Sequence, residues 1–152
     1  MSLKARAIAL LARREYSRSE LRAKLAGDRS GSAAGLTEID AVLDELAALG
    51  YLSDARFAQQ FTRQKTGAYS KRAIGASLKA RGVEGSAAAD ALAGIETDDY
   101  DTMLALWRRR FGTPPASEKE KARQVRFLQS RGFSLSAILK LLRDPPAEDP
   151  TV

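Results

Sequence analysis

The stretch LKARGV (residues 78–83) decides the fold of this 152-residue chain, because it returns without a gap as LQSRGF (residues 128–133). Both stretches read as the end of a helix, a glycine that terminates it, and an apolar residue that follows. Leu92 then lies as far behind Leu78 as Leu142 lies behind Leu128. A helical unit that recurs at fixed spacing predicts a repeat protein.

A looser copy precedes these two. Leu25 is followed by Leu43, four residues further along than in the other copies, and the excess falls in a turn-rich loop over residues 27–35. Insertions in a loop cost little free energy, so the same helical unit can form despite the longer loop. A second match pairs Tyr16, Ser17, Leu21 and Leu25 with Tyr69, Ser70, Ile74 and Leu78.

Apolar residues at three- and four-residue spacing predict helix nearly throughout, in nine segments. The first runs from about residue 3 to 14, and the second opens at Ser17, where Ser17 and Glu20 form a capping box. We expect the third to start after Thr37, bury Ile39, Leu43 and Leu46, and stop at Gly50.

The fourth helix begins at Ser53 with Phe57 and Phe61 facing its core, and the fifth follows Ser70. The core positions of the remaining four helices are expected to be Ala88, Leu92 and Ile95; Tyr100, Leu104, Trp107 and Phe111; Val125 and Leu128; and Ile138, Leu141 and Leu142.

The expected fold is therefore all-α, a tandem array of three three-helix repeats that is elongated and curved. The predicted boundaries are 1–52, 53–96 and 97–143, followed by an acidic, proline-containing flexible tail over 144–152.

Charge is sorted along the chain in blocks. Residues 1–25 carry seven basic and two acidic side chains, and residues 26–55 carry one and six. Seven bases without an acid follow over 56–81, then six acids without a base over 82–101, then ten bases against two acids over 102–143. Blocks of basic residues in a protein of net charge +6 indicate binding to a polyanion.

Composition argues against an enzyme. The chain has no cysteine and no histidine, so thiolate chemistry, the usual general base and the commonest metal ligand are all absent. We expect no catalytic residue, no metal and no cofactor. No segment has the length of uncharged apolar residues that a membrane-spanning helix needs, and no signal peptide is evident, so a cytoplasmic monomer without membrane contact is expected.

Three stretches resemble a known family. LGYLSDARFA (residues 49–58) resembles the signature of RecX, the bacterial regulator of the RecA recombinase. LARREYSRSEL (residues 11–21) resembles the opening repeat of that family, and RFLQSRGF (residues 126–133) its last. The resemblance covers about residues 3–143. Ser53 departs from it, since the family often has an acidic or amide residue there, but serine also caps helices.

The resemblance implies a function. RecX proteins are tandem three-helix repeats that lie in the groove of the RecA–DNA filament and usually inhibit filament growth, ATP hydrolysis and strand exchange, in DNA repair, recombination and the SOS response. The implied partners are the RecA filament and, weakly and electrostatically, single- and double-stranded DNA.

Candidate contacts follow from helical geometry. Three groups of basic residues share a helix face: Arg56 with Arg63; Lys71, Arg72 and Lys79; and Lys119, Arg123 and Arg126. Arg81 belongs to the same acid-free block as the first two groups, and Arg108 and Arg109 are further candidates in the last basic block.

Other interpretations stay open at this stage. Basic stripes are usually solvated faces, and Arg56, beside Asp54, could form a structural ion pair instead. Trp107 and the tyrosines could stack on bases but are better explained as core residues. Glu84 and Asp90 have no partners that would complete a metal site. The alternatives to a recombinase regulator are a general helical DNA-binding protein that competes for DNA and a scaffold for other proteins.

Overall fold

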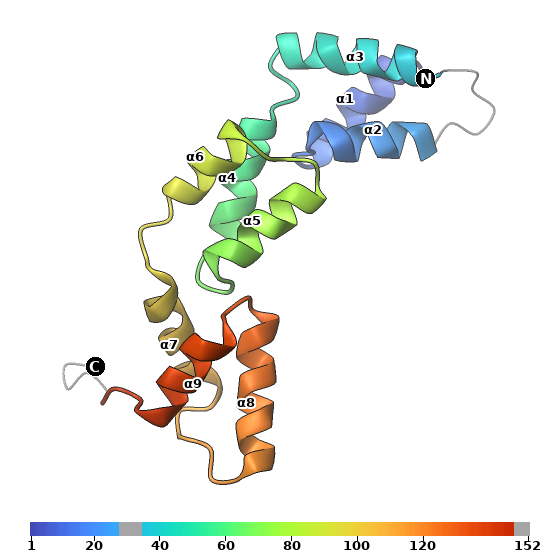
Figure 1. Ribbon diagram of the computed structural model, residues 1–152. Helices are drawn as coiled ribbons and strands as arrows, with labels where there is room; N and C mark the ends of the chain where they lie inside the picture. Colours follow the sequence, from blue (N-terminus) through green and yellow to red (C-terminus); the bar gives the residue numbers. More distant parts are fainter. Residues whose placement is uncertain (28–34, 148–152) are drawn as a thin grey trace. The chain divides into compact units, whose positions relative to one another are not determined.

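The computed structural model describes residues 1–27 and 35–147, and within these two ranges it contains nine α-helices and no strand beyond an isolated bridge between Thr66 and Tyr69 (Figure 1). The prediction of an all-α protein with nine helices is thus confirmed. Part of the predicted loop over 27–35 and the end of the predicted tail lie outside the described residues.

The first three helices enclose a hydrophobic core. They are α1 (Leu3–Arg13), α2 (Arg18–Gly27) and α3 (Leu36–Ala48) (Figure 1). Apolar residues of all three helices are removed from water, and Leu52 closes the cluster from the segment after α3. The buried members are Ala7, Tyr16, Leu21, Leu25, Ile39, Leu43, Leu46 and Leu52.

The middle helices are α4 (Asp54–Lys65), α5 (Lys71–Ala80) and α6 (Ser86–Ala93). Phe57 and Phe61 of α4 are buried as predicted, and their rings stack with centroids 5.8 Å apart. Helix α6 is short and rich in alanine, and Ala91 is its buried position. Ile95, expected on this helix, lies beyond its last residue, since the helix ends at Ala93 and Gly94 caps it.

The last three helices, α7 (Asp99–Arg110), α8 (Glu118–Ser130) and α9 (Leu135–Arg143), enclose a second core. Its buried members are Met103, Leu106, Trp107, Leu128, Phe133, Ile138, Leu141 and Leu142. The expected core face of α7 was partly wrong. Tyr100 is 45% exposed, and the inward face is centred on Met103, Leu106 and Trp107, with Leu104 and Phe111 packed at its edge.

Helix ends follow the local signals of the sequence. The Ser17 hydroxyl accepts a hydrogen bond from the Glu20 amide, and the Glu20 carboxylate accepts one from the Ser17 amide, each at 3.1 Å, which confirms the capping box. Gly50 has a φ of 84° after α3, as expected of a terminating glycine. Helix α3 itself begins at Leu36 behind Gly35, so the predicted start after Thr37 was slightly late.

The chain divides into two compact units. Unit 1 contains residues 1–64 and 75–94, and unit 2 contains residues 65–74 and the chain from residue 95 onward. Helix α5 therefore contributes residues 71–74 to unit 2 and residues 75–80 to unit 1. The three repeat boundaries expected from the sequence stay predictions.

Candidate functional site: basic side chains on helix ends and faces

In both units, the end of one helix docks on the start of another. In unit 1, the Ser17 hydroxyl at the start of α2 donates to the carbonyl of Arg81, just after α5, at 2.6 Å. In unit 2, the Ser70 hydroxyl at the start of α5 donates to the carbonyl of Gly132, just after α8, at 2.8 Å. The repeated sequence therefore produces a repeated tertiary contact.

A glycine makes each docking possible. A Cβ atom on Gly82 would collide with the side chain of Ser19, and a Cβ atom on Gly132 would collide with the side chains of Ser70 and Ala73. Both glycines also have positive φ, 80° and 97°. The glycine in each repeated motif thus ends a helix and admits a neighbouring helix at the same time.

A carboxylate adds a second hydrogen bond next to each docking serine. Asp54 at the start of α4 accepts a hydrogen bond from the amide of Arg18 at 2.7 Å, and Asp99 at the start of α7 accepts one from the amide of Lys71 at 3.0 Å. Each carboxylate satisfies an amide at the open start of another helix, where negative charge is favoured.

Two of the predicted binding residues hold unit 1 together. The Arg56 guanidinium donates to Glu15 at 2.6 Å and to the carbonyls of Gly50 and Tyr51. The ion pair considered with Asp54 is therefore formed with Glu15. Arg81 lies over the Phe61 ring at 4.6 Å, with its Nε 3.7 Å from a Glu20 carboxylate oxygen.

Three other predicted residues have partial partners in unit 2. Arg72 donates to the carbonyl of Gly132 at 3.3 Å, and Arg108 donates to the carbonyls of Pro146 and Ala147. Arg123 pairs with Glu120 at 3.4 Å, although 61% of its side chain is exposed. These contacts are exposed, so each guanidinium can also reach a ligand.

The remaining predicted cations are unpaired. Within the part of the chain that the structure describes, their side chains make no hydrogen bond or ion pair: Arg63, Lys71, Lys79, Arg109, Lys119 and Arg126. All but Lys71 are exposed. Cations that serve no internal partner remain available to phosphate or carboxylate groups of another molecule.

Sequence reasoning missed a second kind of basic residue, which packs on aromatic rings in unit 2. Arg110 lies 4.8 Å from the centre of the Phe127 ring, and Arg131 lies between Phe127 and Tyr69, at 5.2 and 5.0 Å. The signal was present, since aromatic and basic residues alternate near the ends of α4, α7 and α8. The spacing alone did not show that they meet.

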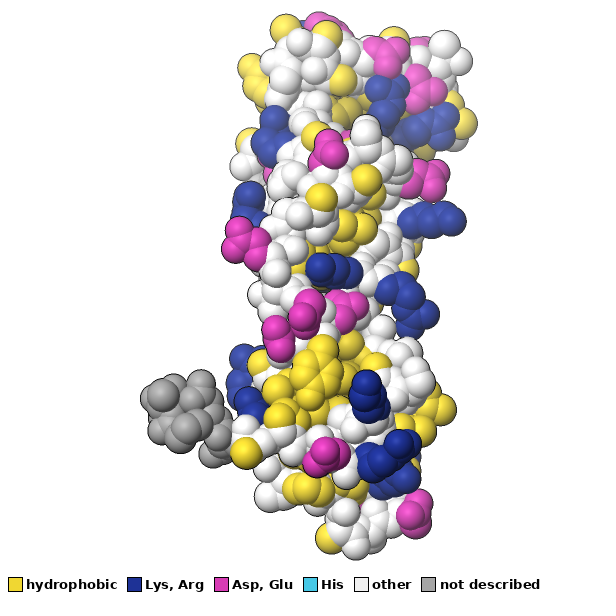
Figure 2. Space-filling model, turned by 60° about the vertical axis from the view of Figure 1, so that its left-hand side comes forward, with side chains coloured by type: hydrophobic (Ala, Val, Ile, Leu, Met, Phe, Trp, Pro, Cys, Tyr) yellow, Lys and Arg dark blue, Asp and Glu magenta, His cyan; other side chains and the backbone are white. Residues whose placement is uncertain are grey.

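The aromatic residues themselves follow the core interpretation only in part. Trp107 is buried, and its indole N–H donates to Gln124 at 2.8 Å. Tyr16 is buried as well, but Tyr51 and Tyr100 are 51% and 45% exposed, which corrects the expectation for the tyrosines. Figure 2 shows hydrophobic side chains gathered on the surface formed by α7 and α9.

The ion pair between Arg22 and Asp40 shifts the pKa values of both side chains. Arg22 donates to both carboxylate oxygens of Asp40, at 2.8 and 3.3 Å. These hydrogen bonds lower the pKa of Asp40, with weaker opposition from partial desolvation and further support from the charges of Arg22 and Arg18. The same partnership raises the pKa of Arg22.

Neither a metal site nor a membrane span emerges from the described ranges. No three potential ligand side chains gather there to hold a metal ion. Of the helices in the same ranges, none combines the length and apolar character needed to cross a bilayer.

The fold and the surface define an all-helical repeat protein that presents unpaired cations to solvent. Family models give the same class: the second three-helix domain of RecX matches residues 53–92, and the third three-helix domain matches residues 96–142. The chain belongs to the RecX family.

Curated relatives support the same family, and a solved structure shows the same fold. The regulatory protein RecX of Leptothrix cholodnii is 43% identical over 94% of this chain and 88% of its own length. That of Chromobacterium violaceum is 43% identical over 97% and 93%. The crystal structure of RecX from Lactobacillus salivarius superposes with a TM-score of 0.69 at 20% identity, covering 93% of this chain and 92% of the other, which shows the shared fold.

Proposed function

We propose that this protein regulates the RecA recombinase by binding the RecA–DNA filament in its groove and inhibiting filament growth, ATP hydrolysis and strand exchange. Membership of the RecX family, at 43% identity over nearly the whole chain, supports the proposal. The protein would act by occupying the filament, without chemistry of its own.

The observation that carries the DNA part of the proposal is the set of exposed cations on α8. Lys119, Arg123 and Arg126 share one side of that helix, and Lys119 and Arg126 have no partner within the described residues. Phosphates of a filament-bound strand would supply that partner, with release of counterions. Lys71 and Lys79 on α5 are candidates for the same role.

The three-repeat organisation suits this task. We propose repeats over 1–52, 53–96 and 97–143, with basic helix faces on the second and third, so that one monomer in the cytoplasm would follow several subunits of a helical filament. Within each unit a docking glycine admits a neighbouring helix, so the cations of that unit would be held at fixed spacing.

The test is ATP hydrolysis by RecA filaments preassembled on single-stranded DNA, with this protein titrated in. Inhibition at fewer than one protein per bound RecA subunit, with weak binding to the same DNA alone, is expected of a regulator. Inhibition that appears only when the protein saturates the DNA would replace the proposal with simple competition for DNA.

Charge reversal provides the matched variants. Lys119→Glu with Arg126→Glu should weaken inhibition at least several-fold. Arg13→Glu with Lys140→Glu makes the same change in net charge at exposed positions outside the proposed site, and should leave inhibition unchanged. Equal losses in both pairs would assign the effect to net charge and remove α8 from the site.

A further inference from the structure

Seven residues of unit 2, which we name the cation–aromatic surface, bring basic and aromatic side chains together at the ends of α4 and α7 and along α8. They are Lys65, Tyr69, Arg110, Phe111, Arg123, Phe127 and Arg131. We infer that this surface binds single-stranded nucleic acid by stacking unpaired bases on its guanidinium groups. The inference deepens the proposed function and rests on it.

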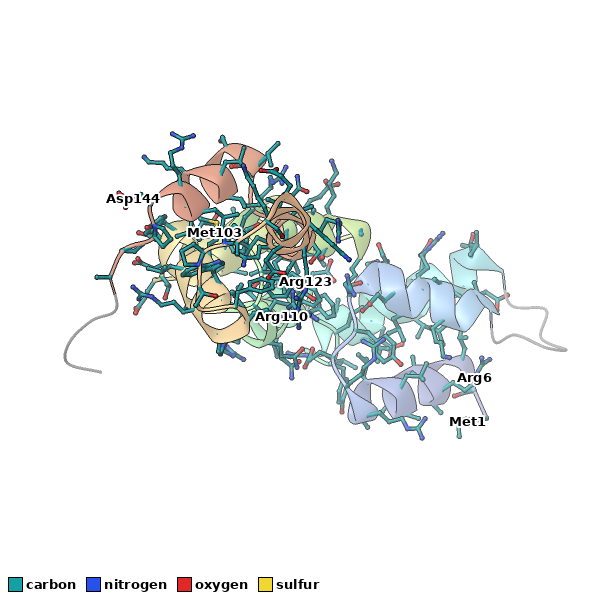
Figure 3. All side chains as sticks on the ribbon, turned by 90° about the horizontal axis from the view of Figure 1, so that it is seen from below. Met1, Arg6, Met103, Arg110, Arg123 and Asp144 are labelled. Atoms are coloured by element: carbon teal, nitrogen blue, oxygen red, sulfur yellow. The ribbon has the colours of Figure 1, made fainter. Side chains whose placement is uncertain are left out.

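Ring contacts connect the surface into a continuous series. Phe111 and Phe127 meet edge to face, with centroids 5.6 Å apart and an interplanar angle of 82°. Arg123 lies 5.6 Å from the Phe111 centroid, and Arg110 of the neighbouring helix lies 4.8 Å from the Phe127 centroid (Figure 3).

The series continues toward the turn between α4 and α5. Arg131 lies over both Phe127 and Tyr69, and its guanidinium donates to the carbonyl of Ala68 at 3.4 Å. Lys65 lies 5.6 Å from the Tyr69 centroid. Four cations and three rings are thereby held in one arrangement, with Arg123 as the outermost cation at the Phe111 end.

The surface remains open to solvent and strongly basic. Arg110 and Arg123 are exposed, and the three rings are half-buried, so the rings support the guanidinium groups from below. Of the three arginines of the surface, Arg123 pairs with Glu120 at 3.4 Å, and Arg110 and Arg131 form no ion pair within the described residues. Contacts made only for folding do not require exposed guanidinium groups, yet Arg110 and Arg123 stay exposed beside their rings.

Stacking chemistry identifies the ligand. An arginine held over a single ring, as Arg110 is over Phe127 and Arg123 over Phe111, leaves the other side of its planar guanidinium for a nucleobase to stack on. Arg131 has a ring on each side, so it supports the surface and does not stack on a base. Unpaired bases expose their faces, whereas bases in a duplex stack on each other and do not. Lys119 and Arg126, exposed on the same helix, lie within the stretch that would meet the adjoining phosphates.

The experiment compares three ligands in the absence of RecA, by fluorescence anisotropy at low salt. The probes are a 20-mer of thymidylate, a 20-base-pair duplex, and a 20-mer of abasic deoxyribose phosphates. Stacking predicts that the thymidylate strand binds about tenfold or more tightly than the abasic strand, since each stacked base contributes on the order of tenfold. Equal affinity for the two strands would overturn the inference.

Charge-conserving variants locate the effect. Arg110→Lys with Arg123→Lys keeps the charge and removes the planar group, so it should weaken thymidylate binding about tenfold and change duplex binding less than twofold. Arg13→Lys with Arg143→Lys, at two exposed arginines outside the surface, is the matched control and should change neither. Circular dichroism melting would verify that each variant folds.

The outcomes separate this inference from the proposed function. Equal losses for strand and duplex would mean phosphate contact only, and no loss would mean a purely structural surface; both overturn stacking. Inhibition of RecA by the wild-type protein tests the regulator independently. RNA of the same length would show whether the base alone or also the sugar is recognised.

Discussion

At the scale of the residue, the repeated glycines do two separate things. Gly82 and Gly132 adopt positive φ, and each also occupies a place where any side chain would collide with a neighbouring helix. Gly50 and Gly67 have similar φ values, 84° and 89°, but open space around them. Gly50 and Gly67 therefore serve as controls, because they share the backbone conformation of Gly82 and Gly132 without the close approach of a neighbouring helix.

Alanine substitution should separate the two effects. Gly50→Ala and Gly67→Ala should lower the free energy of unfolding by about 1–2 kcal/mol, the cost of a left-handed conformation. Gly82→Ala and Gly132→Ala should cost about 1–3 kcal/mol more, because the neighbouring helix has to move. Urea unfolding of the four variants measures the difference. Equal costs would show that the docking contacts are not present in solution.

Another residue-scale prediction concerns Gln124, whose buried side chain accepts from the Trp107 indole and donates to the carbonyl of Thr113. Gln124→Met keeps the volume but leaves the indole N–H unpaired, and should cost about 1–3 kcal/mol of stability. Trp107→Phe removes the donor, so in that background the same substitution should cost less. A double-mutant cycle of thermal or urea unfolding measures the coupling, which is absent if water replaces the glutamine.

Acid stability depends on Asp40. Because Arg22 lowers the folded pKa of Asp40 below its ordinary value, the ion pair stabilises the protein above that ordinary value, about 4, and the contribution is lost as pH falls through the lowered pKa. Asp40→Asn should therefore melt lower than wild type at neutral pH, and the difference should shrink in acid. A constant difference across the acid range would contradict the assignment.

At the scale of the element, three helices that begin with serine offer a comparison. The hydroxyls of Ser17, Ser70 and Ser117 each accept an amide hydrogen bond three residues further on. Ser17 and Ser70 are buried and also donate to the end of another helix, whereas Ser117 is exposed at the start of α8 and has the capping contact alone.

This difference predicts unequal effects of the same substitution. Ser117→Ala should cost about 1 kcal/mol, as expected of a lost helix cap. Ser17→Ala should cost about 1–2 kcal/mol more, since the carbonyl of Arg81 loses its donor in a buried place. Denaturant unfolding measures both, and equal values would mean that the docking bond adds nothing to the cap.

At the scale of the whole molecule, binding to nucleic acid depends more on where the basic residues lie than on the net charge. The net charge of +6 attracts nucleic acid at a distance, whereas direct contact depends on which cations stay accessible in the fold. Arg56 and Arg81 belong to the most basic block, yet both stabilise unit 1 through neighbouring side chains. Lys119 and Arg126 form no such internal contact within the described residues.

Salt dependence should distinguish these two groups. Lys119→Gln with Arg126→Gln should reduce the slope of log affinity against log salt for single-stranded DNA by about 1–2, as expected when two phosphate contacts are lost. Arg13→Gln with Lys140→Gln should leave the slope nearly unchanged. Anisotropy titrations at several salt concentrations measure the slope, and equal reductions in the two double variants would refute a localised site.

Local interactions made most helices predictable from the sequence. The capping box at Ser17 and Glu20, the terminating Gly50 and the buried Ile138, Leu141 and Leu142 depend on residues a few positions apart, so spacing and residue type suffice. The repeated LKARGV and LQSRGF stretches likewise indicated a repeat protein, and LGYLSDARFA, LARREYSRSEL and RFLQSRGF indicated the RecX family, to which the chain belongs.

The sequence alone therefore determined the helices, the repeat and the family. Only the tertiary structure decided which charges are occupied and which are available. Glu15 and Arg56 are 41 residues apart in the sequence, and Ser17 and Arg81 are 64 apart, so no local sequence pattern predicts these contacts. The meeting of Arg110, Phe127 and Arg131 likewise depends on how α7 and α8 pack. Contacts between distant residues arise from packing, which helical periodicity does not specify.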